Sequence, residues 1–264
     1  MCGIAGYSLS ARSGIHRTLA VQSLLAGIAE RGADAVGYAY RIEAPGPVTI
    51  CKQRTGASEL LHRISVPEQA TQALLHVRDY TKGHPSIEAN NHPIRHGAVV
   101  GIHNGLIVND DDLFDREGIE RAEPEMTVDS EIIFALAERA RGHTAPALEK
   151  LEGAMATAWL DEARPELILA RGTCRPLWLG LGRDEMLFAS TREALELAER
   201  YVHVKLRKVE VPVGMLLAVA EGEVVARERF RPDHSFDEGV PLPAVRAPDE
   251  RAHCLAVLAA LATA

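Results

Sequence analysis

The sequence of 264 residues has few of the features that mark several large protein classes. Its four cysteines lie far apart, at positions 2, 51, 174 and 254, which argues against a disulfide framework or a zinc ribbon and favours a reducing compartment. No apolar run approaches the ~18 residues of a membrane-spanning helix. The opening residues also lack the basic and apolar regions of a signal peptide. We therefore expect a cytoplasmic protein without a membrane partner.

Clustered positive charge and ligand-binding motifs are also scarce. Lys and Arg number 29 against 37 Asp and Glu, a net charge of -8, which argues against a nucleic-acid surface. The eleven histidines are scattered and no HExxH pair occurs. No G-x-x-x-x-G-K-[ST] phosphate loop is present either. The sequence therefore predicts a protein with no metal and no cofactor.

What the sequence does contain is a regular succession of short apolar runs, 47% of the residues being hydrophobic. Their spacing predicts four helices, over 18–30, from Thr127 or Asp129 to about 140, over 191–200 and over 249–264. It also predicts strands over 4–9, 35–42, 48–54, 72–78 and 96–103, and several hairpins between 154 and 229. Strands grouped into hairpins, with helices before and between them, favour an α+β layered sandwich. Residues 231–248, rich in Pro and Asp, indicate a linker or a surface wrap.

The second residue is a cysteine, in the run Met1-Cys2-Gly3-Ile4-Ala5-Gly6. Removal of the initiator methionine would place its thiol beside a free α-amine, whose pKa of about 7.7 to 8.0 lets it take the thiol proton near neutral pH. Nucleophile and base would then belong to one residue. The apolar run after Cys2 predicts a buried strand that holds this end of the chain in place.

Three polar segments lie where loops should follow strands. The first is the turn Arg31-Gly32-Ala33-Asp34, and the second runs from His76 to Ser86 and continues in Asn90-Asn91-His92-Pro93. The third is His103-Asn104-Gly105. An Asn-Gly pair is typical of a hairpin turn, yet it could also present an amide side chain and an open backbone N–H to an oxyanion.

The motifs MCGIAG, RGADAVG, HVRDYTKGHPS with NNHP, HNGLIVN and TVDSE follow one another over residues 2 to 131. In this order they resemble the class II glutamine amidotransferase domain of the N-terminal-nucleophile hydrolases, as found in glucosamine-6-phosphate synthase and phosphoribosylpyrophosphate amidotransferase. The likeness extends to about residue 230 without sharp motifs. It implies a four-layer αββα sandwich, with a glutaminase domain over 2–230 followed by a linker and a C-terminal amphipathic helix over 231–264.

The resemblance also implies a role for each matching residue. Cys2 matches the nucleophile that releases ammonia from the side chain of glutamine and leaves a γ-glutamyl thioester, and Asn104 and Gly105 match the oxyanion hole. Four residues match positions that bind the substrate: Arg78 for its α-carboxylate, Asp129 for its α-ammonium, Thr81 in the loop that closes over it, and His92 beside this loop. Arg31 and Asp34 match the turn that supports the N-terminal residue, or else they form a structural salt bridge.

Two groups of residues carry further expectations. For His76, His92 and His103 we favour structural hydrogen bonds over general-base work, because the amine already fills that role. Asp79 and Lys82 stand where glucosamine-6-phosphate synthase carries tryptophan and histidine, so loop closure is expected to differ.

The sequence leaves the ammonia acceptor and the oligomeric state open, and a homo-oligomer is compatible with it. We expect glutamine as the substrate and a separately encoded synthase as the partner. The synthase would dock on a stripe of Leu255, Leu258 and Leu261 in the last helix. Alternatively, this stripe packs on its own domain. A stand-alone amidohydrolase for a γ-glutamyl or related amide would use the same Cys2 chemistry. A non-catalytic regulatory module would follow if Met1 is retained.

Overall fold

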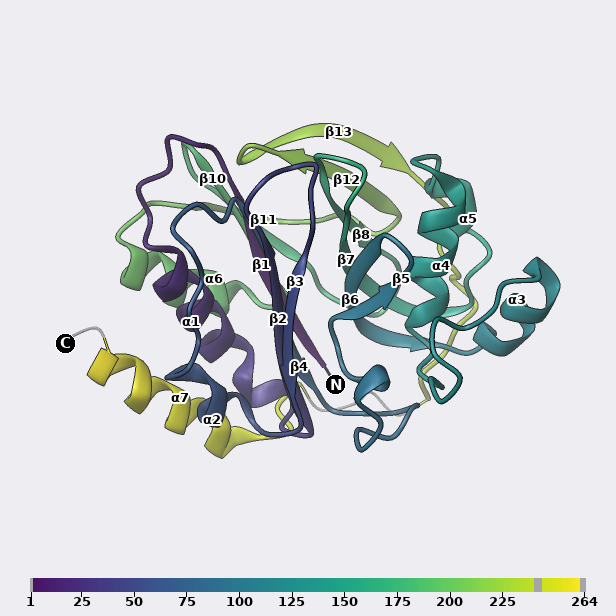
Figure 1. Cartoon of the computed structure of the whole chain (residues 1–264), viewed down its shortest axis with the longest axis horizontal. Helices are drawn as coiled ribbons and strands as arrows, with labels where there is room; N and C mark the ends of the chain where they lie inside the picture. Colours follow the sequence, from purple (N-terminus) through teal and green to yellow (C-terminus); the bar gives the residue numbers. More distant parts are fainter. Residues whose placement is uncertain (1, 240–243, 262–264) are drawn as a thin grey trace.

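The computed structural model describes residues 2–239 and 244–261 and consists of two β-sheets packed face to face (Figure 1). Helices cover the outer face of each sheet, which gives four layers in the order helix, sheet, sheet, helix. The αββα sandwich expected from the sequence is therefore confirmed.

The first sheet pairs its strands in the order β11-β9-β10-β1-β4-β2-β3. These strands are β1 (Gly3–Leu9), β2 (Ala35–Arg41), β3 (Thr49–Gln53), β4 (Gln72–Arg78), β9 (Trp178–Leu181), β10 (Glu185–Ala189) and β11 (Arg207–Glu210). Outside it lie α1 (Arg17–Ile28), the short turn η1 (Ala29–Arg31), α2 (Ala57–Leu61), α6 (Arg192–Val202) and α7 (Pro248–Leu261).

The second sheet has the order β13-β12-β8-β7-β6-β5. Its strands are β5 (Ile94–His96), β6 (Val99–Ile107), β7 (Gly153–Asp161), β8 (Leu167–Arg171), β12 (Met215–Ala220) and β13 (Glu223–Arg229). The helices of its outer face are α3 (Asp110–Glu117), α4 (Glu131–Ala140) and α5 (Ala145–Leu148), and the short turn η2 (Glu88–Asn90) precedes β5.

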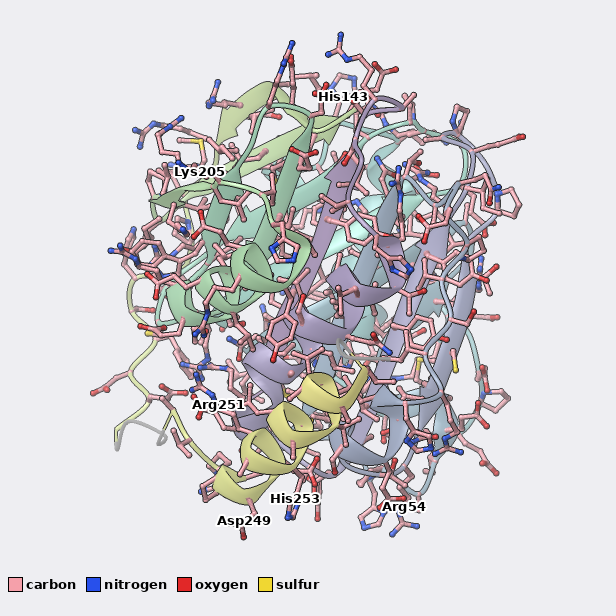
Figure 2. All side chains as sticks on the ribbon, turned by 90° about the vertical axis from the view of Figure 1, so that its left-hand side faces the viewer. Arg54, His143, Lys205, Asp249, Arg251 and His253 are labelled. Carbon is pink, nitrogen blue, oxygen red and sulfur yellow. The ribbon has the colours of Figure 1, made fainter. Side chains whose placement is uncertain are left out.

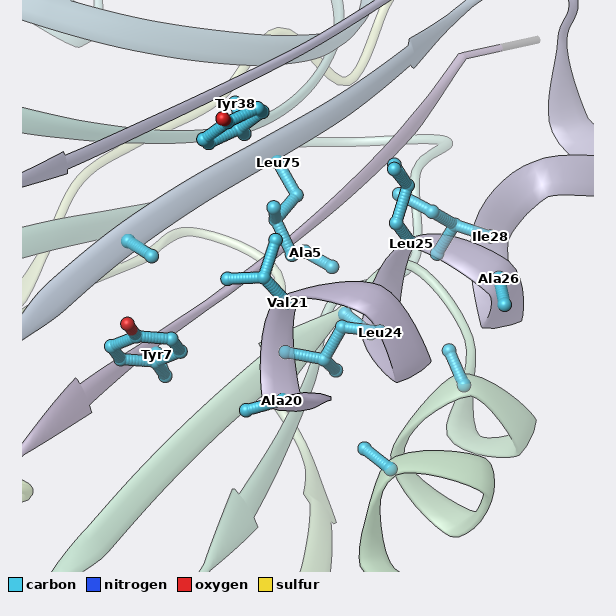
Figure 3. Close-up of a cluster of buried hydrophobic side chains, with 14 of the residues drawn as sticks. Ala5, Tyr7, Ala20, Val21, Leu24, Leu25, Ala26, Ile28, Tyr38 and Leu75 are labelled. Carbon is cyan, nitrogen blue, oxygen red and sulfur yellow. The ribbon is translucent and has the colours of Figure 1, made fainter. Parts of the chain in front are cut away.

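Apolar side chains fill each of the three spaces between the layers. Helix α1 is buried around almost its whole circumference, because it lies between the first sheet and the helices α6 and α7. Figure 3 shows Val21 and Leu24 of α1 directed toward Ala5, Tyr7 and Leu75 on the sheet. Burial on this scale fixes β1, and with it the position of Cys2.

The loop expected at Asn104-Gly105, after a strand ending at 103, is not found, and the pair does not form a hairpin turn. Strand β6 continues through both residues to Ile107 and pairs with β7 along its whole length. Gly105 has a φ of 157°, and a side chain there would collide with the carbonyl oxygen of Ala154 on β7. The glycine therefore permits close contact between two strands, and the local Asn-Gly preference for a turn yields to the ladder.

The longer helices occur where the periodicity places them. Helix α1 begins after His16, whose Nδ1 accepts a hydrogen bond from the Leu19 N–H, and α6 begins after Thr191, which caps Ala194 in the same way. Helix α4 starts later than expected, at Glu131, because the Asp129 side chain binds a neighbouring strand and leaves the helix start uncapped. The short helices α2, α3 and α5 were not predicted.

The chain after β13 forms a surface wrap rather than a free linker. Asp233 accepts a hydrogen bond from the Gly153 N–H, and Arg246 pairs with Asp79. Helix α7 follows at the expected place, although residues 262–264 lie outside the described part of the chain. In Figure 2 it lies in front of the outer layer, with Asp249 and His253 on its exposed side.

The leucine stripe of α7 packs on its own domain. Leu258 is fully buried in the core formed with α1 and α2, and Leu255 packs against the same core. Glu250 adds hydrogen bonds to the backbone and side chain of Ser58 at the start of α2. Of the two alternatives left open by the sequence, the structure shows the intramolecular one, and Leu258 is not available to a partner.

Candidate active site

Cys2 lies at the start of β1, which runs between β10 and β4 in the middle of the first sheet. Two buried groups hold this point: the Ile4 N–H donates to Ser190 Oγ at 2.9 Å, and Arg31 Nε donates to the Cys2 carbonyl at 2.8 Å. The Cys2 thiol donates a hydrogen bond of 3.4 Å to the Asp79 carbonyl oxygen. Burial raises the pKa of this thiol, so the cysteine needs a base to become nucleophilic.

Asn104 lies on β6, in the opposite sheet, and is completely buried. Neither its side-chain nitrogen nor its side-chain oxygen has a hydrogen-bond partner among the described residues. An unpaired buried amide is unusual, because it loses its hydrogen bonds to water without replacing them. The Asn104 side chain therefore has free donor capacity at a buried position.

A cavity of about 360 Å³ brings these residues together. Its walls come from β1, from the loop after β4, from β6, from the loop after β8 and from the chain after β13. The lining residues are Cys2, Asp79, Thr81, Asn104, Gly105, Leu106, Arg175, Phe236, Asp237 and Glu238. Four of the residues expected at the site, Cys2, Thr81, Asn104 and Gly105, thus border one space.

Three histidines are buried on or beside β6, and the ring of His103 faces Ser130 before α4. The His76 ring stacks on the His92 ring at 4.1 Å, and its Nε2 donates to the His103 carbonyl at 3.0 Å. His103 Nε2 faces the Ala154 carbonyl and must donate to it, so His103 Nδ1 accepts from Ser130 Oγ at 2.8 Å. Burial lowers the pKa of His76 and of His103 to about 3. Such rings are neutral and weakly basic at pH 7, as the structural interpretation requires.

His92 differs from the other two because both of its ring nitrogens are buried with no hydrogen-bond partner in residues 2–239 and 244–261. Burial lowers its pKa well below the usual range. It stacks on His76 and does not line the cavity, so a direct contact with substrate stays a prediction.

Arg78 ends β4 and is almost fully buried. Its guanidinium donates to Asn91 Oδ1 at 2.6 Å and to the carbonyl oxygens of Lys82 and Gly83. The side chain thus holds the loop that carries Thr81 and is not among the cavity-lining residues. The expected pairing of Arg78 with a substrate carboxylate is not tested by this arrangement.

Asp129 is buried just before α4, and its carboxylate accepts a hydrogen bond of 2.8 Å from the Ile107 N–H. Burial raises the pKa of this carboxyl to about 6. Because Ile107 is the last residue of β6, Asp129 lies at the same end of that strand as Asn104. It does not line the cavity, and its expected contact with an ammonium group stays a prediction.

Arg31 and Asp34 support the site through the backbone. Asp34 Oδ2 accepts from the Tyr80 N–H at 2.9 Å, at the start of the loop after β4, while Arg31 binds the Cys2 carbonyl. Between these two described residues there is no ion pair. Gly32 between them packs so closely on the backbone of Arg78 that a Cβ would clash with it. The turn therefore fixes the positions of both Cys2 and the loop.

Sequence reasoning missed two residues of the cavity, Arg175 and Glu238. Arg175 is 2% exposed, and its guanidinium pairs with the Glu238 carboxylate inside the cavity. A charged residue between the apolar runs of β8 and β9 was the available signal for Arg175. Glu238 belongs to an irregular segment without periodicity, which offers no such signal.

Two structural searches complete the description. Over residues 2–239 and 244–261, no group of three or more His, Cys, Asp or Glu side chains is placed to hold a metal ion. In the same residues no helix is both long enough and apolar enough to cross a membrane.

Comparison with known proteins decides the family. The family model of the glutamine amidotransferase domain matches residues 76–197. The glutamine–fructose-6-phosphate aminotransferase of Escherichia coli O6:H1 is 32% identical over 209 residues, which cover 74% of this chain and 32% of that enzyme. This chain carries a class II glutamine amidotransferase domain.

Further relatives agree with this assignment. The aminotransferase of the same name from Symbiobacterium thermophilum is 31% identical over 251 residues, 88% of this chain and 39% of that enzyme. Among solved structures, the glutamine phosphoribosylpyrophosphate amidotransferase of B. subtilis has a TM-score of 0.68 at 21% identity and covers 87% of this chain and 49% of its own. That likeness shows the shared N-terminal-nucleophile hydrolase fold. The amidotransferase domain described here spans about a third of the length of the first curated relatives that it matches.

Proposed function

We propose that this domain hydrolyses the side-chain amide of glutamine through a γ-glutamyl thioester on Cys2 and delivers the ammonia to an acceptor. The observation that carries the proposal is the cavity that joins the Cys2 thiol, the unpartnered Asn104 amide and the backbone of Gly105. A nucleophile opposite free hydrogen-bond donors is the arrangement that acyl transfer requires.

The base in this proposal is the α-amine of Cys2 after removal of Met1. Burial keeps the thiol protonated, and the pKa values of about 3 for His76 and His103 make these rings poor proton acceptors. An α-amine has a pKa near 8, which suits proton transfer near neutral pH. The expected intact mass of the active protein is therefore lower than that of the full sequence by one methionine.

The reaction then proceeds in two acyl-transfer steps. The amine takes the thiol proton, and the sulfur attacks the amide carbon, whose oxygen becomes an oxyanion held by the Asn104 amide and the Gly105 N–H. The C–N bond breaks, and the departing nitrogen takes the proton from the amine and leaves as ammonia. Water, deprotonated by the same amine, cleaves the thioester and releases glutamate.

We further propose residues 2–230 as the glutaminase unit, a cytoplasmic setting, and a synthase partner as the acceptor of ammonia. The curated relatives are named as glutamine–fructose-6-phosphate aminotransferases, and this chain matches about a third of their length. The partner would approach a surface other than the leucine stripe, since α7 uses Leu258 in its own core. The sugar or other acceptor is left open.

The test is the release of glutamate and ammonia from glutamine by the purified chain and by Cys2→Ala. The variant should have no turnover and an unchanged melting temperature, because within the described part of the chain the thiol makes a single hydrogen bond, to the Asp79 carbonyl oxygen. A glutamine-like electrophile should label Cys2, and the exposed Cys174 serves as the internal control for non-specific labelling. Turnover retained in Cys2→Ala, or label on Cys174 alone, would overturn the assignment.

Asn104→Ala tests the oxyanion hole separately. Loss of one such donor lowers kcat by about 10² to 10³. Because the amide has no partner among the described residues, the same variant should be no less stable than the parent in urea denaturation. A large loss of stability would instead indicate a structural role for this side chain.

A further inference from the structure

The chain after β13 forms one wall of the Cys2 cavity. In Figure 1 this segment runs in yellow from the outer layer beside α4 and α5 toward the end of the sandwich where β1 begins. Phe236, Asp237 and Glu238 border the cavity, and the half-buried ring of Phe236 is the bulkiest of the three side chains. We call residues 233–238 the strap.

The strap is fastened at both ends. At its start, Asp233 accepts a hydrogen bond of 3.1 Å from the Gly153 N–H, and its carbonyl oxygen accepts one of 2.9 Å from Thr173 Oγ1. At its end, both terminal nitrogens of the Arg175 guanidinium donate to the Glu238 carboxylate. Arg175 is 2% exposed, and solvent and salt screen such a buried pair much less than a surface one. These contacts hold the residues between the two ends in place.

The register of the second sheet places the strap on the β7 side of Asn104. Asn104 of β6 lies opposite Ala156 of β7, which in turn lies opposite Arg171 of β8. The chain then leaves β8 toward β9 and carries Thr173 and Arg175, which hold the strap. The strap therefore borders the cavity from the side of β7 and β8.

The residues expected to bind the α-groups of glutamine lie on the other side of β6. Asp129 accepts a hydrogen bond from the Ile107 N–H, whereas the Val108 N–H points to β7 and donates to Glu152. Successive N–H groups of a strand point to opposite sides, so Asp129 lies on the side of β6 away from β7. Arg78 ends β4, from which the chain crosses to β5, the other neighbour of β6.

We propose that the strap restricts the enzyme to primary amides, because a glutamine held by its α-groups on the β5 side of Asn104 would direct any substituent on its amide nitrogen against Phe236. The inference rests on the proposed glutaminase function. The cavity of about 360 Å³ is near the lower end of small-molecule pockets, roughly 300 to 1,000 Å³, which suits glutamine itself. An aryl group on the amide nitrogen would need the space that Phe236 occupies, whereas ammonia as the leaving group does not.

The kinetic test compares L-glutamine with L-γ-glutamyl-p-nitroanilide. Both give the same γ-glutamyl thioester, and p-nitroaniline is the better leaving group, so a slow reaction of the anilide indicates steric exclusion. We expect kcat/KM of the parent to be at least about 10²-fold lower for the anilide. In Phe236→Ala the value for the anilide should rise by about 10-fold or more, and that for glutamine should change by less than about threefold. Equal use of both substrates by the parent, or an equal change for both in the variant, would overturn the proposal.

A second variant tests the fastening of the strap. Arg175→Met/Glu238→Gln removes both charges together, so neither side chain is left as an unpaired buried ion. Its kcat/KM for the anilide should rise by about 3- to 10-fold over the parent. Glu149→Gln is the matched control, since Glu149 pairs with Arg231 just before the strap and does not border the cavity. No rise in the double variant, or the same rise in the control, would overturn the role of the ion pair.

Alkylation of Cys2 separates this inference from the proposed function, because it needs no turnover. Iodoacetamide should label Cys2 of the parent at least about 10-fold faster than an N-aryl iodoacetamide does, and in Phe236→Ala the two rates should converge. The exposed Cys174 gives the intrinsic rate ratio of the two reagents. If neither amide is hydrolysed but this pattern holds, the glutaminase proposal fails and the strap stands. If glutamine is hydrolysed but both reagents label Cys2 of the parent equally fast, the strap fails and the glutaminase stands.

Discussion

At the scale of single residues, the buried Asn104 amide is the clearest sign of ligand chemistry. Leaving a buried polar group unpaired costs roughly 1 to 3 kcal/mol, which a folded protein recovers only through a partner. Here the cavity that also holds Cys2 supplies room for one. The site therefore holds its donor ready before substrate arrives, as electrostatic stabilisation of a transition state requires.

Asp129 gives a prediction for the pH dependence of activity. Its pKa of about 6 means that the carboxylate proposed to accept the substrate ammonium becomes protonated as the pH falls through this value. We expect kcat/KM for glutamine to decrease below pH 6 in the parent chain. Asp129→Asn should lower kcat/KM by about 10- to 100-fold at pH 7.5, since a charge-assisted hydrogen bond contributes about 1.5 to 3 kcal/mol.

Steady-state kinetics between pH 5 and 8 check this expectation. The variant should lack the decrease centred near pH 6, and a variant that retains it would place the titrating group elsewhere. The pH dependence of the unfolding free energy supplies a control. The pKa of Asp129 in the folded state lies above its value of 3.8 in the unfolded state, so the folded state binds the proton more tightly. The contribution of Asp129 to the unfolding free energy should therefore decline as the pH rises from about 4 to about 6, and not in Asp129→Asn.

The family resemblance pointed to candidate residues of the site, but not to their partners in the folded chain. The order of motifs indicated Cys2, Asn104 and Asp129. Arg175 and Glu238 could not be anticipated, because an ion pair across a long sequence separation depends on how β8 and the chain after β13 pack. Pairing of this kind is a property of the folded chain and has no local pattern.

At the scale of elements, the loop after β4 is held at two points. Arg78 binds its backbone from inside, and Lys82 pairs with Asp110, which is buried at the start of α3, and with Asp111. Thr81, between them, borders the cavity. The loop is thus fastened to α3 in the outer layer of the second sheet.

Lys82→Ala should loosen this loop. We expect the KM for glutamine to rise about 10-fold while kcat changes less, because the substitution weakens positioning and leaves Cys2 and Asn104 in place. Lys150→Ala is a suitable control, since Lys150 forms a comparable pair with Glu117 in the same outer layer but far along the chain from the loop. If Lys82→Ala and the parent have identical kinetics, the ion pairs of Lys82 do not hold the loop for substrate binding.

Element boundaries followed the sequence where packing and local preference agree, as in α1 and α6. They departed where tertiary contacts override a short motif: the Asn104-Gly105 pair lies within β6 because β7 pairs with it on both sides of the motif. A single sequence shows the turn preference of the pair but not the neighbouring strand.

At the scale of the whole molecule, α7 closes the outer layer of the first sheet. Leu258 is fully buried, whereas Leu261 on the same helix is only half-buried. Leu258→Ala should lower the unfolding free energy by about 2 to 4 kcal/mol through lost burial and a cavity. The matched change Leu261→Ala should cost less than about 1 kcal/mol. Urea denaturation of both variants decides, and equal effects would mean that α7 is not packed as described.

A layered α+β sandwich was predictable from the alternating and helical apolar patterns along the chain, whereas its four-layer αββα form was implied by the family resemblance. The contacts of α7 were not, since its stripe of leucines fits a partner surface as well as its own domain. An amphipathic pattern indicates that a helix has an apolar face, but it does not indicate which surface covers that face.

The central place of β1 in its sheet bears on the order of events during synthesis. The strand that carries the nucleophile pairs on one side with β4 but on the other with β10, which ends only at Ala189. In a nascent chain that is still emerging from the ribosome, one edge of β1 therefore stays unpaired until synthesis has passed β10, in the last third of the polypeptide. The strand that follows Cys2 therefore gains its second neighbour only after β10 is made.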